Sequence, residues 1–321
     1  MSGMYRNWVK LRSKISFQRM IQLVSAAAFN GYVVGFGKGK IFTGKSKAVC
    51  VPVLNCYSCP GALGACPVGS LQTALGGRHH FPFYVLGLMM LFGVLLGRLV
   101  CGLLCPFGLV QDLLHKIPVS KWQLPKKLDR SMRYLKYIIL FGIVILLPVF
   151  MAAKIRIVPP YFCKYICPAG TLGGGIPLMF ANPALRTLAG ILFSWKVLVL
   201  ILILVLSMFI PRPFCRYLCP LGAFYSVFNR LSFYQMHLED RKCVGCKKCE
   251  HSCPMSVEIT QNINSPECIR CGKCKTICQA RAISSGFMVE YKARYKRNLS
   301  EEEQFIQMYL REDGYENKQK Y

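Results

Sequence analysis

Two cysteine runs near the C-terminal end of the chain carry its most specific chemistry. The first, CVGCKKCEHSCP at 243–254, has the spacing C-x2-C-x2-C-x3-C-P, and the second, CIRCGKCKTIC at 268–278, repeats it without the proline. Three closely spaced thiolates can bind one face of an iron–sulfur cube, and the fourth ligand then comes from the other run. The runs therefore predict two 4Fe–4S clusters, one held by Cys243, Cys246, Cys249 and Cys278 and the other by Cys268, Cys271, Cys274 and Cys253.

A pair of structural zinc sites is the alternative interpretation of these runs. Such sites usually draw on two separated CxxC pairs, whereas here two triplets overlap with their fourth cysteines, so iron–sulfur chemistry is favoured. Gln279 follows Cys278 where a proline is usual. We expect this difference to change the local turn slightly and to leave Cys278 a ligand.

A second cysteine pattern recurs in the apolar part of the chain. CGLLCPFG at 101–108, CKYICPAG at 163–170 and CRYLCPLG at 215–222 share the form Cys-x3-Cys-Pro-x-Gly, and CYSCPGALGACPVG at 56–69 is a looser version. Cysteines four residues apart on a helix lie on one face, and two thiolates are half the ligand set of a cubane cluster. The proline suits the first turn of a new helix. Each motif is therefore predicted to be a corner where one helix ends and an amphipathic interfacial helix begins.

Small apolar filling at helix ends is the alternative role for the corner cysteines, since a free cysteine packs as a small hydrophobe. One isolated pair would fit that role. Three copies with the same ending, and a fourth variant, favour metal ligands instead.

Composition and long apolar stretches predict a membrane protein. Of the 321 residues, 53% are hydrophobic and 17% are charged, with a mean hydropathy of +0.35, whereas soluble domains average roughly 25% charged residues. Crossing a bilayer takes about 20 residues. We therefore predict a mainly α membrane domain with four transmembrane helices, at about 18–36, 81–100, 134–153 and 188–210.

Basic residues beside these stretches predict their orientation. Their distribution places the N-terminus, the loop 111–136 and everything after 211 in the cytoplasm, so we expect a multi-pass protein of the inner cell membrane. A cleaved signal peptide is the alternative for the first stretch; a retained helix is favoured because the apolar run continues through GYVVGFG at 31–37. The net charge of +27 is explained by topology and anionic lipid, so we expect contact with the bilayer and no nucleic-acid partner.

Alternating topology pairs the corners two by two. The second and fourth stretches end at the cytoplasmic face, and the first and third end outside. We therefore predict one 4Fe–4S cluster on each face, separated by a hydrocarbon core about 30 Å thick. The ligands are Cys101, Cys105, Cys215 and Cys219 inside, and Cys163, Cys167 and Cys66 with either Cys56 or Cys59 outside.

Other residues offer weaker signals. Cys50 is interpreted as a buried thiol, with a disulfide to Cys56 on the outer face as the alternative. His79 and His80 could contact a quinone, but interfacial histidines without that role are favoured. Arg98 either offsets cluster charge or extends to the interface. No Ser/His/Asp set or carboxylate pair is evident, and we predict no catalytic residues.

Taken together, these motifs resemble a membrane polyferredoxin of the NapH type, a group related to the C-terminal part of the nitrous-oxide reductase regulator NosR. The resemblance covers nearly the whole chain and implies three parts: a four-helix transmembrane domain with cysteine corners at 1–235, a two-cluster bacterial-ferredoxin-like α+β domain at 236–285 and a charged tail at 286–321. In the tail, Ser300 and Glu303 form a capping box; the helix it begins either packs on the ferredoxin-like domain or docks a partner.

The resemblance implies electron transfer between a quinone-pool or cytoplasmic donor and a partner redox protein. Clusters on both faces would allow transfer across the membrane, so we expect an electron-transfer subunit of an oxidoreductase system and not a stand-alone enzyme. The expected partners are redox proteins or reductase subunits, among them an extracytoplasmic flavoprotein or a ferredoxin. The alternative is a redox-sensing or metal-cofactor maturation protein that uses the same clusters.

Overall fold

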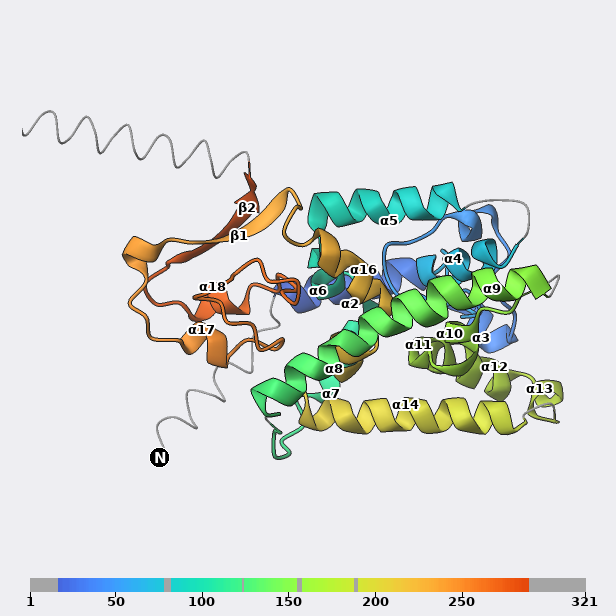
Figure 1. Cartoon of the computed structure of the whole chain (residues 1–321). Helices are drawn as coiled ribbons and strands as arrows, with labels where there is room; N and C mark the ends of the chain where they lie inside the picture. Colours follow the sequence, from blue (N-terminus) through green and yellow to red (C-terminus); the bar gives the residue numbers. More distant parts are fainter. Residues whose placement is uncertain (1–16, 78–81, 123, 155–157, 188–189, 289–321) are drawn as a thin grey trace, which may run out of the picture.

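Two long apolar helices run through a helical bundle that carries a small lobe at one end (Figure 1). The first is continuous over 29 residues, Lys126–Lys154, and comprises α8 (Lys126–Ile138), the π-helix η2 (Ile139–Leu146) and α9 (Leu147–Lys154). The second is α14 (Ile191–Phe209), of 19 residues. The computed structural model describes residues 17–77, 82–122, 124–154, 158–187 and 190–288.

Both long helices expose apolar side chains. Phe150 is 69% exposed on α9, and Leu198 is 58% exposed on α14. Such helices are long enough to span a bilayer, which requires about 20 apolar residues. In water, a continuous apolar surface of this kind would be unfavourable, whereas lipid covers it at no cost. The two helices therefore indicate a membrane location.

The first two predicted spans form shorter helices than expected. Helix α2 (Phe17–Phe29) has 13 residues and α5 (Phe83–Leu96) has 14. At a rise of about 1.5 Å per residue, α5 is only about 21 Å long. It ends because Gly97 adopts a left-handed φ of 54°. Among the described residues the structure thus has two helices of spanning length, where the sequence predicted four.

The corners themselves have the predicted local structure. At each corner the last cysteine is the N-cap residue and the following proline is the first residue of a new helix, where its missing N–H costs nothing. These helices are α4 (Pro67–Leu75), α7 (Pro106–Leu114), α11 (Pro168–Gly170) and α16 (Pro220–Phe228). The other short elements of the bundle are α3 (Val34–Lys38), η1 (Lys45–Ala48), α6 (Leu99–Leu103), α10 (Tyr161–Tyr165), η3 (Thr171–Gly175), α12 (Ile176–Ala181), α13 (Pro183–Thr187) and α15 (Pro213–Tyr217).

The predicted interfacial position is wrong for the helix after the fourth corner. Most residues of α16 are buried, and it packs against α5, α8, η2 and α4. Tyr225 and Ser226, near its middle, are fully buried. Because α16 has protein on several sides, its polar groups are paired inside the bundle: Ser226 Oγ lies 2.6 Å from Tyr137 Oη.

The lobe at the end of the bundle contains a two-stranded antiparallel sheet and short helices (Figure 1). Strand β1 (Tyr234–Leu238) pairs with β2 (Ile283–Phe287) in the register Tyr234 to Phe287 and Leu238 to Ile283. Between them lie η4 (Asp240–Lys242), α17 (Lys248–His251) and α18 (Lys273–Ile277). Six buried apolar residues form its core, namely Met236, Met255, Val257, Ile259, Ile269 and Ile283.

A buried ion-pair network attaches the lobe to the bundle. Glu267 of the lobe accepts from Arg98 at 3.0 Å and from Lys136 at 2.6 Å, and both basic side chains are fully buried. Arg98 therefore does not extend to solvent, and it also donates to the Cys215 carbonyl. At Gly102 a β-carbon would lie 2.2 Å from the Ile269 carbonyl oxygen, so only glycine permits this close approach.

We expect this network to be needed for docking of the lobe. Replacing Glu267→Ala would leave Arg98 and Lys136 buried without a counter-charge, which destabilises a protein by about 3–5 kcal/mol. The apparent melting temperature of the purified protein in detergent should fall clearly. Glu258→Ala is the matched control, because it breaks a solvent-exposed ion pair with Lys126 and should change the melting temperature little. Equal effects of the two changes would contradict the structural role of Glu267.

Candidate iron–sulfur centres

The second predicted cysteine set of the lobe surrounds one pocket. Cys253, from the first run, and Cys268, Cys271 and Cys274, from the second, line one pocket together. Burial raises the pKa of the Cys268 thiol to about 11 and that of Cys274 to about 12, and the neighbouring cysteines add to both rises. Four thiols that disfavour one another's charge in this way are suited to a cation or a cluster that neutralises them.

The first cysteine site of the lobe lies at its surface. Helix α17 contains Cys249, and Cys278 directly follows the last residue of α18. The two helices pack against each other. Lys248 Nζ donates to Gln279 Oε1 at 3.4 Å, which places the end of the second run beside the first. Cys246 is the one exposed cysteine of the chain.

Left-handed residues give the two runs the same backbone shape. On the two sides of Cys246, Gly245 and Lys247 have φ values of 66° and 52°. On the two sides of Cys271, Arg270 and Gly272 have φ values of 52° and 77°. Successive backbone N–H groups in such turns face one side of the loop and form an anion-binding concavity, which suits an iron–sulfur cluster with thiolate ligands.

The turn after each run is also the same. The third residue after Cys253 is Ser256, with φ 46°, and the third residue after Cys278 is Arg281, with φ 50°. The turn that starts at Gln279 after the second run therefore matches the turn that starts at Pro254 after the first run.

The proximal site, defined as Cys101, Cys105, Cys215 and Cys219, lies in the bundle next to the lobe. All four thiols are buried. They are close enough to interact electrostatically: Cys215 with Cys101 and Cys105, and Cys219 with the other three. The cysteines of the second and fourth corners thus face one another.

The distal site lies farther from the lobe and joins the first and third corners. Cys163 and Cys167 both interact electrostatically with Cys66 and with Cys56. Cys59 instead donates to Asn30 Oδ1 at 3.6 Å, outside this set. The arrangement favours Cys56 over Cys59, a choice that the sequence left open. We define the distal site as Cys56, Cys66, Cys163 and Cys167.

Cys50 takes part in neither site. Its thiol donates to Ser70 Oγ at 3.5 Å, and its backbone forms a parallel bridge with Ala65. All eighteen cysteines lie within the described residues and all are free thiols. The interpretation as a buried thiol therefore agrees with the structure, and a Cys50–Cys56 disulfide is not present.

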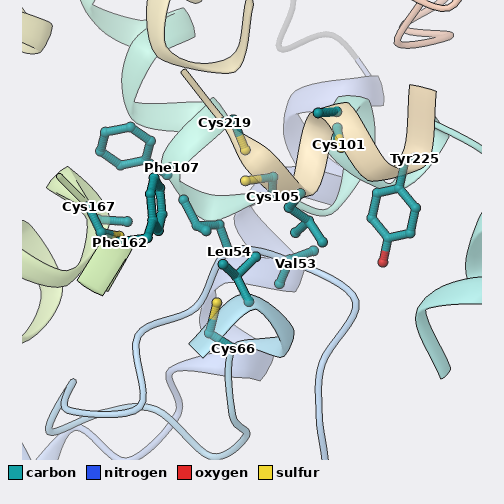
Figure 2. Packing of buried hydrophobic residues seen from close by; sticks show 14 of the residues in the cluster. Val53, Leu54, Cys66, Cys101, Cys105, Phe107, Phe162, Cys167, Cys219 and Tyr225 are labelled. Carbon is teal, nitrogen blue, oxygen red and sulfur yellow. The ribbon is translucent and has the colours of Figure 1, made fainter. Parts of the chain in front are cut away.

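The predicted separation of the two bundle sites by the full hydrocarbon core is wrong. Both belong to one buried cluster of residues, and the loop before Cys56 reaches between them. The backbone N–H of Leu54 hydrogen-bonds the Cys105 thiol, and that of Asn55 hydrogen-bonds the Cys66 thiol. Figure 2 shows Leu54 between Cys105 and Cys66. The sites are close because the loop folds into the bundle.

Buried arginines fill the space between the proximal site and the lobe. Arg212 interacts electrostatically with both Cys215 and Cys271, and Arg216 lies near Cys253. Arg212 is held in place by Asp112, at 2.8 Å from Nε. Positive side chains at this position offset the negative charge that thiolate-bound clusters bring into a low-dielectric interior.

Three buried polar residues beside the cysteines were missed in the sequence. Tyr225 lies near Cys66 of the distal site and near three proximal cysteines, and its hydroxyl donates to the Pro52 carbonyl at 3.1 Å. Gln72 and Gln111 donate to cysteine sulfurs of the distal and proximal sites. A shared position could have revealed the glutamines, because each is the sixth residue after a corner cysteine.

Some predicted features fall outside the described residues. These are His79 and His80, which were considered for a quinone, and the capping box of Ser300 and Glu303 in the tail.

The donor set fits iron–sulfur clusters. Each of the four proposed ligand sets consists of four cysteines with no nitrogen donor, and thiolates are the ligands that such clusters require. Within the parts of the chain that the structure describes, no group of three or more His, Cys, Asp or Glu side chains is set to hold a single metal ion. A cubane distributes its ligands over four irons, so its cysteines surround a larger volume than one ion needs.

Comparison with known families agrees with the chemistry of these sites. The bundle matches a 4Fe–4S binding domain family at residues 79–125, 137–177 and 192–235, and the lobe matches a 4Fe–4S dicluster domain family at residues 235–279. An uncharacterised protein of Methanocaldococcus jannaschii, MJ0750, is 35% identical over 200 residues, which are 60% of this chain and 74% of that protein. The chain belongs to the polyferredoxins. It is an iron–sulfur protein of the ferredoxin type.

Two further relatives of this polyferredoxin come from Escherichia coli. The putative electron transport protein YccM is 27% identical over 62% of this chain and 54% of its own length. The ferredoxin-type protein NapH is 24% identical over 66% of this chain and 71% of its own length. The polyferredoxin thus spans about half of YccM and more of NapH. No solved structure matches it.

We expect the two neighbouring cysteines of the first corner to behave differently. Cys56→Ser should lower the iron content of the anaerobically purified polyferredoxin by about four atoms per chain, because a cubane would lose a ligand. Cys59→Ser should leave the iron content unchanged, because this thiol lies outside the distal set. Iron analysis of both variants decides the question, and the reverse result would assign Cys59 to the site.

Proposed function

We propose that this polyferredoxin is a membrane-bound electron-transfer protein with four 4Fe–4S clusters. The proposed ligands are the two cysteine sets of the lobe, the proximal set and the distal set. Each cluster supplies a one-electron carrier whose potential depends on its surroundings. The sites follow one another from the first lobe site to the second, then to the proximal site and then to the distal site.

The exposure of the cysteines along this row is the observation that carries the proposal. Cys246 is exposed at one end, the four proximal cysteines are all buried, and Cys56 is half-buried at the other end beside exposed Tyr57. A conducting path needs an accessible group at each end and protection from solvent in its middle. A sensor with one cluster would need neither the second accessible end nor the row.

Side chains of the chain itself favour transfer between neighbouring sites. Arg212 lies between the lobe and the proximal site, where its charge favours a negatively charged cluster on either side. Leu54 and Tyr225 fill the space between the proximal and distal sites and exclude water from it. Without mobile water or loose packing, the surroundings reorganise little when an electron arrives.

Redox proteins are the proposed partners at the two ends, and the bilayer surrounds the bundle. Together with its resemblance to NapH and YccM, the exposed apolar surface of α9 and α14 supports a membrane location. The distribution of basic residues beside the apolar stretches supports a cytoplasmic position for the lobe. A partner in the cytoplasm would then exchange electrons with the lobe, and a second partner would meet the distal end.

The number of clusters can be measured directly. We expect about sixteen iron atoms and about sixteen acid-labile sulfides per chain in anaerobically purified protein, because four cubanes carry four of each. A value near eight would confine the clusters to the lobe and refute the proposed row. A substantial zinc content would refute the iron–sulfur assignment of the corners as well.

The pairing of corners makes a separate prediction. Cys105→Ser and Cys219→Ser should remove the same electron paramagnetic resonance signal, because both thiols belong to the proximal set. Cys167→Ser should remove a different signal and leave the proximal cluster reducible through the lobe. If Cys105→Ser and Cys219→Ser abolish different signals, the second and fourth corners do not share a cluster.

A further inference from the structure

Gln111 connects the two halves of the proximal site through hydrogen bonds. Its side chain is fully buried. Oε1 accepts from the backbone N–H of Phe214 at 3.2 Å, and Nε2 donates to Cys215 Sγ at 3.3 Å. Gln111 lies in α7, six residues after Cys105. A residue of the second corner therefore hydrogen-bonds the first cysteine of the fourth corner, Cys215.

Gln72 makes the same contacts in the distal site. It is also fully buried. Oε1 accepts from the backbone N–H of Phe162 at 3.0 Å, and Nε2 donates to Cys163 Sγ at 3.9 Å. Each glutamine also donates four residues back along its own helix at 3.4 Å, to the carbonyl of Phe107 or Val68. The two sites are therefore built to one plan.

The backbone segments that donate to these two glutamines also have the same hydrogen-bond pattern. Phe162 accepts at its carbonyl from Ile166 and Cys167, each at 2.9 Å, and Phe214 accepts from Leu218 and Cys219 at the same distance. In sequence, Gln72 and Gln111 are each the sixth residue after a corner cysteine, in CPVGSLQ and CPFGLVQ. The corners without this glutamine, CPAGTLG and CPLGAFY, are the ones that receive it.

A structural role accounts for only half of this arrangement. The carbonyl oxygen of each glutamine satisfies an N–H at the start of a short helix, where the backbone lacks an internal partner. A buried amide must also satisfy its N–H groups, and here one of them faces a sulfur that belongs to a proposed cluster ligand. Capping the helix does not require this N–H···S contact.

We propose that Gln72 and Gln111 are positioning residues whose N–H···S hydrogen bonds set the reduction potentials of the distal and proximal clusters. This inference rests on the proposed function. Reduction adds negative charge to the cluster and its thiolates, and an N–H dipole directed at a ligand sulfur stabilises that charge. Each glutamine thus raises the potential of its own site and makes the buried cluster easier to reduce.

Two substitutions separate this role from helix capping. Gln111→Met keeps the approximate volume and removes both hydrogen-bonding functions. Gln111→Glu keeps an oxygen that can accept from Phe214 N–H and replaces the donor with a second oxygen. The matched pair for the distal site is Gln72→Met and Gln72→Glu. Redox titration of full-length anaerobic protein, followed by electron paramagnetic resonance, gives the midpoint potential of each signal, assigned through Cys105→Ser and Cys167→Ser.

We expect each glutamine variant to shift only the potential of its own site to more negative values, with iron content unchanged. Both the methionine and the glutamate variant should shift it, because neither keeps the amide N–H that faces the sulfur. The other three signals serve as internal controls of folding.

Three results would overturn the inference while leaving the four-cluster assignment intact. One is an unchanged potential in all variants. Another is a normal potential in the glutamate variant with a shifted one in the methionine variant, which would indicate helix capping alone. The third is loss of the site's iron in both variants, which would make the residue necessary for cluster retention. The proposed function itself fails in a different way, through about eight irons in the unaltered protein.

Discussion

A cubane cluster needs four thiolates around it, and no corner of this bundle offers four. In the structure the first and third corners meet, and so do the second and fourth, although about a hundred residues separate the members of each pair. Each corner ends one helix and starts the next with a proline, which presents the cysteines at a helix terminus where backbone N–H groups are unpaired. The packing of the bundle follows from bringing these termini together.

Eight thiols in one interior would bring negative charge into it when they are ionised, and basic side chains nearby compensate for that charge. Thiolates and clusters are negative, and a low-dielectric interior disfavours unpaired charge. Buried Arg98 and Arg212 lie beside the proximal site. They are themselves balanced by Glu267 and Asp112. The Arg98–Glu267 pair also attaches the lobe, so docking of the lobe and part of the charge balance at the proximal site depend on the same contact.

The two cysteine sets of the bundle lie close together in one buried interior. The loop that holds Leu54 and Asn55 enters the bundle and contacts a cysteine of each site. The space between the two cysteine sets is therefore filled by packed protein. The two long helices α14 and α8–η2–α9 hold this arrangement against lipid with their apolar outer faces.

Cysteine spacing alone determined the ferredoxin-type lobe and the corner structure, because ligand spacing within a run and a proline after a cysteine act over a few residues. Apolar length predicted helices of spanning length correctly for α14 and α8–η2–α9. It did not do so for α2 and α5, and α5 ends where Gly97 adopts a positive φ. The choice of Cys56 over Cys59, the adjacent sites and the paired glutamines required the tertiary structure. Each depends on contacts between segments far apart in the chain, which local periodicity does not encode.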